Sequence, residues 1–144
     1  SGFMNIQNCI ERSLLKSDSP DLEKSRRSIE TAMHKIEIAE KELKAEIYEN
    51  ALTTAYSAMF HAARALLYKD GFKERSHFAL CVFVNEKYGS VLEKRFLYAI
   101  NSLREKRHEV MYGIESDSLV HAGEATTAVA TAKEFIQAVK KLVG

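Results

Sequence analysis

Apolar residues recur along most of this chain at the three- and four-residue intervals of an α-helix. A narrow apolar stripe predicts a helix over Pro20–Lys44, with Ser19 as its N-cap and Pro20 as its first residue. A broader apolar arc over Ile47–Lys69 predicts a central helix that packs on more than one neighbour or lies in an oligomer interface. Gly71 suits the left-handed residue that ends such a helix.

Shorter amphipathic segments complete the pattern. The spacing predicts further helices over about residues 5–16, 78–84, 92–110 and 122–142. No segment alternates strongly enough to predict a β-strand, and one Pro with six Gly are too few for a β-sandwich. We therefore predict an all-α fold, an antiparallel up-and-down bundle of four main helices plus shorter ones. It forms a single domain over residues 4–144, and residues 1–3 are typical of a cloning scar.

Overall charge excludes some functions. The 144 residues hold 21 Lys+Arg against 20 Asp+Glu, a net charge of +1, which argues against a protein that coats duplex DNA. No apolar run is long enough to span a membrane, and the start shows no signal-peptide pattern. Cys9 and Cys81 lie far apart, which favours two reduced thiols and a cytoplasmic location.

The charge is unevenly distributed. Residues 51–112 hold ten basic and six acidic side chains, a local balance of +4. A cleft lined by such groups concentrates anionic ligands, although a solvated basic face is the alternative interpretation. The candidate nucleotide- or RNA-binding residues are Lys73, Arg75, His77, Arg104, Lys106 and Arg107.

The end of the helix predicted over residues 92–110 concentrates candidate chemistry. Arg107 falls on its inward stripe, where an unpaired guanidinium is costly, so it has a buried carboxylate partner or opens onto a groove. Arg104 and His108 form the neighbouring stripe, with Tyr112 close by. Arginine binds phosphate in a bidentate manner, and histidine transfers protons near neutral pH. A salt-bridged arginine, a surface histidine and a packing tyrosine are the alternative.

Other kinds of site are absent from the sequence. The histidines and cysteines do not follow metal-ligand spacing, and the glycines are scattered rather than gathered in a phosphate-binding loop. We therefore expect neither a metal nor a cofactor.

One stretch resembles a known family. The segment AYSAMFHAARALL at Ala55–Leu67 is similar to a helix of small prokaryotic HEPN-domain proteins (higher eukaryotes and prokaryotes nucleotide-binding). Ser76-His77 after a glycine turn, and Arg107 followed by Tyr112-Gly113, match further features of that family in order and spacing. The resemblance covers about residues 20–142.

The resemblance implies an all-α bundle that pairs into homodimers. The apolar arc on the central helix agrees with this, and the interface residues would be Tyr56, Phe60, His61 and Arg64. Many HEPN proteins are metal-independent RNases or toxins, often encoded beside a minimal nucleotidyltransferase partner. The resemblance therefore implies a toxin–antitoxin-like module that binds nucleotide or RNA.

The family's active-site pattern is Arg-x4-6-His, in a composite site at the dimer interface. Here the same count from Arg107 reaches Tyr112, so the pattern is degenerate, and His108 follows the arginine. Arg107, His108 and Tyr112 are the candidate catalytic residues. A metal-independent endoribonuclease and a non-catalytic adaptor dimer remain as alternatives to the binding module.

Overall fold

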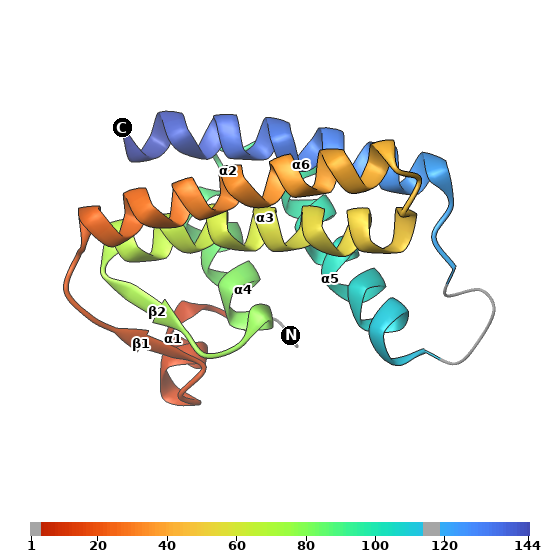
Figure 1. Ribbon diagram of the computed structural model, residues 1–144. Helices are drawn as coiled ribbons and strands as arrows, with labels where there is room; N and C mark the ends of the chain where they lie inside the picture. The colour runs from red at the N-terminus through yellow and green to blue at the C-terminus, as the bar shows by residue number, and fades with distance from the viewer. Residues whose placement is uncertain (1–3, 114–118) are drawn as a thin grey trace.

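Four long helices form the body of the molecule. They are α2 (Leu22–Lys44), α3 (Tyr48–Asp70), α5 (Lys94–Tyr112) and α6 (Ala122–Val143) (Figure 1). The computed structural model describes residues 4–113 and 119–144, so the predicted scar at residues 1–3 lies outside the described residues. The shorter elements are α1 (Ile6–Glu11), α4 (His77–Tyr88), β1 (Leu15–Ser17) and β2 (Phe72–Glu74). The predicted all-α bundle of four main helices plus shorter ones is confirmed.

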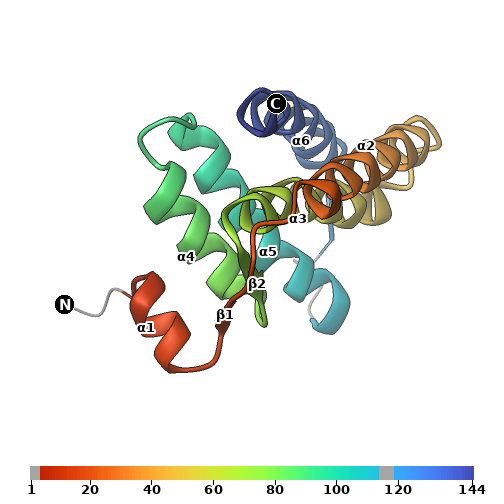
Figure 2. The same ribbon diagram turned by 90° about the vertical axis from the view of Figure 1, so that its left-hand side faces the viewer.

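Helix α3 lies at the centre of the bundle. It contacts α2, α4, α5, α6 and β2 (Figure 2). Its buried face is rich in alanine, whose small side chain lets neighbouring backbones approach closely. Packing within one chain therefore accounts for the broad apolar arc of the sequence. The fully buried alanines of α3 are Ala51, Ala55, Ala58, Ala62, Ala63 and Ala65.

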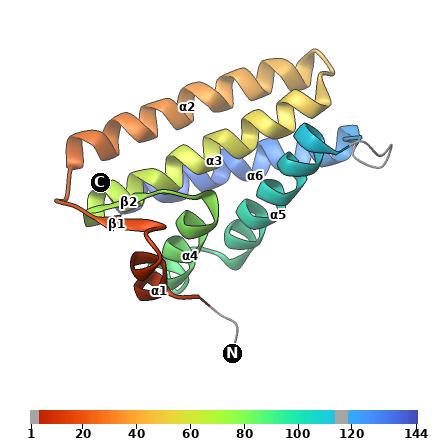
Figure 3. The same ribbon diagram turned by 90° about the horizontal axis from the view of Figure 1, so that it is seen from below.

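Helices α2 and α3 form a close antiparallel pair (Figure 3). Two buried serines of α2 bond directly to the backbone of α3. The Ser25 hydroxyl donates to the carbonyl of Ala65 at 2.7 Å, and the Ser28 hydroxyl donates to the carbonyl of His61 at 2.8 Å. These bonds satisfy hydroxyls that would otherwise be costly to bury, and they fix the register of the pair.

The start of α2 differs from the prediction. Its N-cap is Asp21 rather than Ser19, because the Asp21 carboxylate accepts a hydrogen bond from the backbone N–H of Lys24 at 2.9 Å. Pro20 therefore precedes the helix instead of opening it. An ionised carboxylate also suits the positive end of the helix dipole.

The prediction that the chain has no strands was wrong. β1 and β2 pair antiparallel, with Leu15 opposite Glu74 and Ser17 opposite Phe72. The first helix ends at Glu11 instead of continuing to residue 16. Each strand is only three residues long, too short for alternation to show in the sequence.

Gly71 joins α3 to β2 as the sequence predicts. Its φ of +84° and ψ of 42° place it in the left-handed region, and its N–H caps the carbonyls of Leu67 and Tyr68. A side chain there would clash, because a Cβ on Gly71 would lie 2.7 Å from the carbonyl oxygen of Asp18. Glycine therefore allows β1 and α3 to approach each other here.

Candidate functional site

A cavity of about 540 Å³ lies where the start of α4 meets the C-terminal half of α5. We call it the His77 cavity. Two arginines and two histidines share it with two carboxylates, so side chains from separate helices converge on one opening. Its lining residues are His77 from α4 and Arg104, Glu105, Arg107, His108 and Glu109 from α5.

His77 is the first residue of α4, and its ring is held against α3. Ser76 caps the helix, its hydroxyl accepting from the backbone N–H of Ala79 at 3.0 Å. The imidazole stacks on the ring of Phe60 with centroids 4.3 Å apart. Its Nδ1 lies 2.6 Å from the hydroxyl oxygen of Tyr56. The cap, the stacking and the hydrogen bond together fix the orientation of the imidazole.

Burial and neighbouring cations lower the pKa of His77. Burial is the largest cause, followed by the positive charge of Arg107, and Arg104 and Arg64 act in the same direction. Glu74 opposes them. An imidazole whose pKa lies below the ordinary value of about 6.5 is neutral at pH 7.

The hydrogen bond between Tyr56 and His77 is compatible with a neutral imidazole that keeps its proton on Nε2. Burial raises the pKa of Tyr56, so its hydroxyl keeps its proton. Among the described residues this hydroxyl has Nδ1 of His77 as its hydrogen-bond partner. A protonated hydroxyl can donate to Nδ1, and in that tautomer the neutral ring carries its own proton on Nε2. Nε2–H is then a hydrogen-bond donor for a ligand.

Arg107 lines the cavity, and the part of the chain that the structure describes gives it no carboxylate partner. Within residues 4–113 and 119–144, no Asp or Glu lies within ion-pair distance of its guanidinium. The guanidinium lies 5.7 Å from the centre of the Tyr56 ring, the same ring that contacts His77. Among the described residues, the half-buried arginine therefore opens onto a groove and does not pair with a buried carboxylate.

Arg104 adds a second positive charge. Its Nε is buried and has no hydrogen-bond partner within the described part of the chain. Its contact with Glu105 is long, at 3.9 Å. The guanidinium lies beside the thiol of Cys81, whose pKa burial nonetheless raises to about 11. Cys81 therefore stays a neutral thiol, and little of the charge of Arg104 is compensated.

His108 and Tyr112 lie at the edge of the site. Their ring centroids are 4.9 Å apart. His108 lines the cavity, whereas Tyr112 does not and is 66% exposed. Of the four residues expected to converge, the structure thus brings Arg104, Arg107 and His108 to the cavity and leaves Tyr112 outside it.

Two predicted binding residues, Lys73 and Arg75, lie near the strands instead. Lys73 is opposite Lys16 in the β1–β2 ladder. Arg75 is exposed, and its backbone N–H donates to the carbonyl of Leu14. Neither residue lines the His77 cavity.

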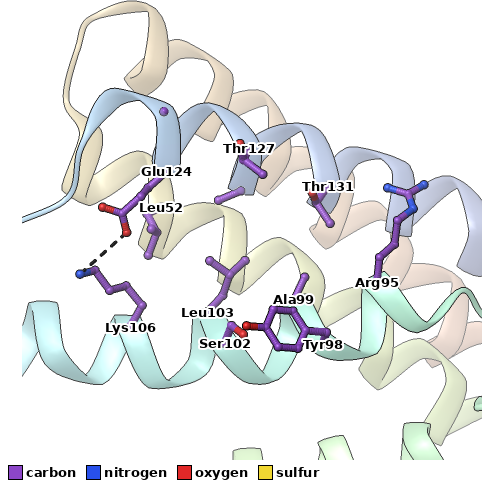
Figure 4. A pocket seen from close by; sticks show the side chains of 12 residues that line it. Leu52, Arg95, Tyr98, Ala99, Ser102, Leu103, Lys106, Glu124, Thr127 and Thr131 are labelled. Atoms are coloured by element: carbon purple, nitrogen blue, oxygen red, sulfur yellow. Dashed lines mark ion pairs between the residues drawn. The ribbon is translucent and has the colours of Figure 1, made fainter.

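Lys106 points away from the site, into a second cavity of about 670 Å³ between α5 and α6 (Figure 4). The wall of this cavity includes Leu52 and Leu103. Lys106 lies at one end, with Nζ 3.8 Å from a carboxylate oxygen of Glu124 (Figure 4). Because its lysine is paired and its wall is largely apolar, this cavity is a poor match for an anion.

The four predicted interface residues divide into two pairs. Tyr56 and Phe60 are buried inside the single chain, at 1% and 9% exposure. Their contacts are with His77 rather than with a surface. His61 and Arg64 remain partly exposed on α3. Only this second pair offers area to a partner.

The contact of Tyr56 and His77 is the part of the site that sequence analysis missed. Each residue was singled out, but for a different role, and they lie 21 positions apart on separate helices. Helical periodicity places residues around one helix and carries no information on which helices meet. A histidine directly after a capping serine was the available signal.

A comparison with family models matches residues 25–142 to the HEPN domain. The match covers most of the chain, so the protein belongs to the HEPN-domain family, as the resemblance in the sequence indicates. No curated protein matches the chain. The family connects this fold, at a coarse level, with nucleotide- or RNA-related functions.

Two further structural findings concern other kinds of function. None of the described helices combines the length and the hydrophobicity that crossing a membrane requires. In the same part of the chain, no three His, Cys, Asp or Glu side chains lie close enough together to hold a metal ion.

Proposed function

We propose that this HEPN-domain protein binds the phosphate groups of a nucleotide or RNA in the His77 cavity. The observation that carries the proposal is the guanidinium of Arg107, which has no carboxylate partner among the described residues and lines one cavity with neutral His77. Arg107 and Arg104 supply charge and paired N–H donors. Nε2–H of His77 supplies a neutral donor. Such a donor set matches phosphate oxygens.

The test is titration of a fluorescent nucleotide and a fluorescent single-stranded RNA at low salt. Arg107→Ala removes a charge-assisted contact, typically worth about 1.5–3 kcal/mol, and should weaken binding about tenfold or more. Arg95→Ala is the matched control, because Arg95 is on the same helix but pairs with Glu93 and Glu134 at its other end. Equal binding by Arg107→Ala and wild type would refute the proposal.

A second candidate function is metal-independent RNA cleavage. The observation that favours it is that His77 brings a second histidine beside Arg107 and His108, although the Arg-x4-6-His pattern ends at Tyr112. In this reaction the 2′-hydroxyl oxygen attacks phosphorus and the bond to the 5′-oxygen breaks. His108 takes the proton of the 2′-hydroxyl, water gives a proton to the departing 5′-oxygen, and neutral His77 donates a hydrogen bond from Nε2–H to a non-bridging phosphate oxygen.

Cleavage is tested with labelled RNA in EDTA. Loss of one group that stabilises developing charge costs about 10²–10³-fold in rate, so Arg107→Ala should nearly abolish cutting. His77→Ala and His108→Ala should each slow it, and the products should carry 2′,3′-cyclic phosphate ends. If wild type binds RNA without cutting it, the binding function stands alone.

We further propose a homodimer that works with a minimal nucleotidyltransferase, in a toxin–antitoxin-like pair. Large apolar side chains are exposed on the two helices that line the cavity, namely Phe78 on α4 and Met111 and Tyr112 at the end of α5. Covering them with a second copy would remove apolar surface from water. Sedimentation of the wild type should give twice the chain mass, and Phe78→Glu should give monomers. A monomeric wild type would overturn the dimer, and co-purification with a co-expressed minimal nucleotidyltransferase tests the pair. A non-catalytic adaptor would dimerise without binding RNA.

A further inference from the structure

A second basic depression lies between α2 and α3, on a surface that the proposed site does not use. It has a volume of about 210 Å³ and is lined by both helices. We call it the α2–α3 groove. Lys24, Arg27 and Thr31 line it from α2, and His61, Arg64 and Tyr68 line it from α3. These residues recur at the spacing of one helix face on each side, so the groove runs along the pair.

The charge of this groove is positive and weakly compensated. No carboxylate is among its lining residues. Arg64 pairs through Nε with Glu74, whereas within the described residues neither Lys24 nor Arg27 lies within ion-pair distance of an acid. Both cations also contact the aromatic lining, since Lys24 and Arg64 lie 5.7 and 5.9 Å from the Tyr68 ring centre.

The field of these cations extends along the groove. Burial is the main cause that lowers the pKa of His61, and the charges of Arg64 and Lys35 lower it further. Lys35 lies eleven residues after Lys24 on α2, a rise of about 16 Å. The positive surface is therefore a track rather than a single point.

The track adjoins the His77 cavity. The guanidinium of Arg64 lies 5.0 Å from the ring centre of Phe60, and Phe60 stacks on His77. Arg64 also contributes to the lowered pKa of His77. Figure 3 shows α2, α3, the start of α4 and the end of α5 on one face, with α6 behind α3. Arg64 thus links the two anion-attracting regions.

We propose that the α2–α3 groove binds the sugar–phosphate backbone of a single-stranded RNA, one phosphate of which lies in the His77 cavity. The proposal rests on the proposed function and specifies its ligand as a polynucleotide instead of a single nucleotide. A basic groove that follows the backbone is how proteins hold single strands without sequence preference. Arg64 and Lys24 contact phosphates at the near part of the track, and Arg27 contacts them beside it.

The experiment measures fluorescence anisotropy of two probes, a labelled RNA of about 12 nucleotides and a labelled dinucleotide, over a range of salt concentrations. The variant is Lys24→Ala combined with Arg27→Ala. The control is Arg26→Ala, which removes one positive charge from the neighbouring position of α2 but does not line the groove. These side chains are at least partly exposed, and thermal melts should show that all variants remain folded.

The proposal predicts a selective loss. Removing two phosphate contacts should reduce the slope of log K against log salt by about 1.4 for the longer RNA. The double variant should bind the dinucleotide as tightly as wild type does. Arg26→Ala should bind both probes like wild type. If the double variant binds the longer RNA like wild type while Arg107→Ala loses both probes, the groove proposal is wrong and the proposed function stands.

Two other outcomes also overturn it. If wild type binds neither probe, the proposed function and the groove proposal fail together. If the double variant sediments differently from wild type in the absence of RNA, the groove is a contact between protein copies. That result would assign His61 and Arg64 to the interface that the sequence analysis expected.

Discussion

The hydroxyl of Tyr56 lies 2.6 Å from Nδ1 of His77 and thereby ties the central helix to the first residue of α4. One contact thus connects the most buried helix of the core to the wall of the candidate site. The stability of the fold and the chemistry of the cavity share a residue, so both should respond to its substitution.

Tyr56→Phe should lower the free energy of unfolding by about 0.5–1.5 kcal/mol, the usual net contribution of one hydrogen bond. The ring remains to fill the core, so packing is little changed. Urea unfolding measures the effect. Tyr98→Phe is the control, because Tyr98 is 76% exposed. Equal losses in both variants would show that the bond to His77 contributes nothing.

Stability should fall as the solution becomes mildly acidic. The pKa values of His77 and His61 are lowered in the folded protein, mainly by burial. Below about pH 6.5 the unfolded chain binds protons that the folded chain does not. The free energy of unfolding should therefore be fully present above that pH and decrease below it, until the pH reaches the lowered pKa values.

The same urea titrations, repeated from neutral pH to about pH 5, test this dependence on histidine protonation. The double variant His61→Gln with His77→Gln should show a flatter dependence over this window. A double variant that loses stability as steeply as wild type would place the titrating groups elsewhere.

Arg107→Ala should change stability by less than about 1 kcal/mol. Removing one member of a buried ion pair costs about 3–5 kcal/mol, but Arg107 has no carboxylate partner among the described residues. The substitution should also raise the pKa of His77, because it removes a neighbouring positive charge. Thermal melts and an NMR titration of the imidazole measure the two effects. A large loss of stability would favour a purely structural arginine.

Gly71→Ala should destabilise the fold by about 2 kcal/mol or more. The residue has a φ of +84°, which costs a non-glycine residue about 1–2 kcal/mol, and its Cβ would clash with the Asp18 carbonyl oxygen.

Gly123→Ala is the opposite case. It lies in α6 with nothing within 4 Å of the added Cβ, so better helix propensity should raise stability by about 0.5–1 kcal/mol. Chemical unfolding of both variants gives the comparison.

Much of the fold could be predicted because helical periodicity is strong in long segments. The stripe through Ile29 and Ile36 and the arc through Tyr56 and Leu67 identify α2 and α3, and all four residues are buried. The three-residue strands could not be predicted, since Leu15 and Glu74 pair across almost sixty intervening positions. Pairing of that kind depends on tertiary contacts that no local pattern encodes.

The candidate site was predictable along one helix and not between helices. Arg104, Arg107 and His108 share neighbouring faces of α5, so their spacing alone placed them together. Lys106 was grouped with them by charge, yet its position on the helix turns it toward Glu124 and the other cavity. His77 from α4 and Tyr56 from α3 could not be placed in the site from the sequence, because their contact depends on how the two helices pack.

The short ladder of β1 and β2 has a consequence for the order of folding. It joins Ser17 to Phe72, so forming it closes a loop that contains all of α2 and α3. Closing so long a loop costs less entropy once the two helices have paired and brought its ends together. Strand pairing should therefore follow the α2–α3 hairpin. Because β2 leads directly into the turn before His77, the polypeptide should complete the His77 cavity in one of the last steps of assembly.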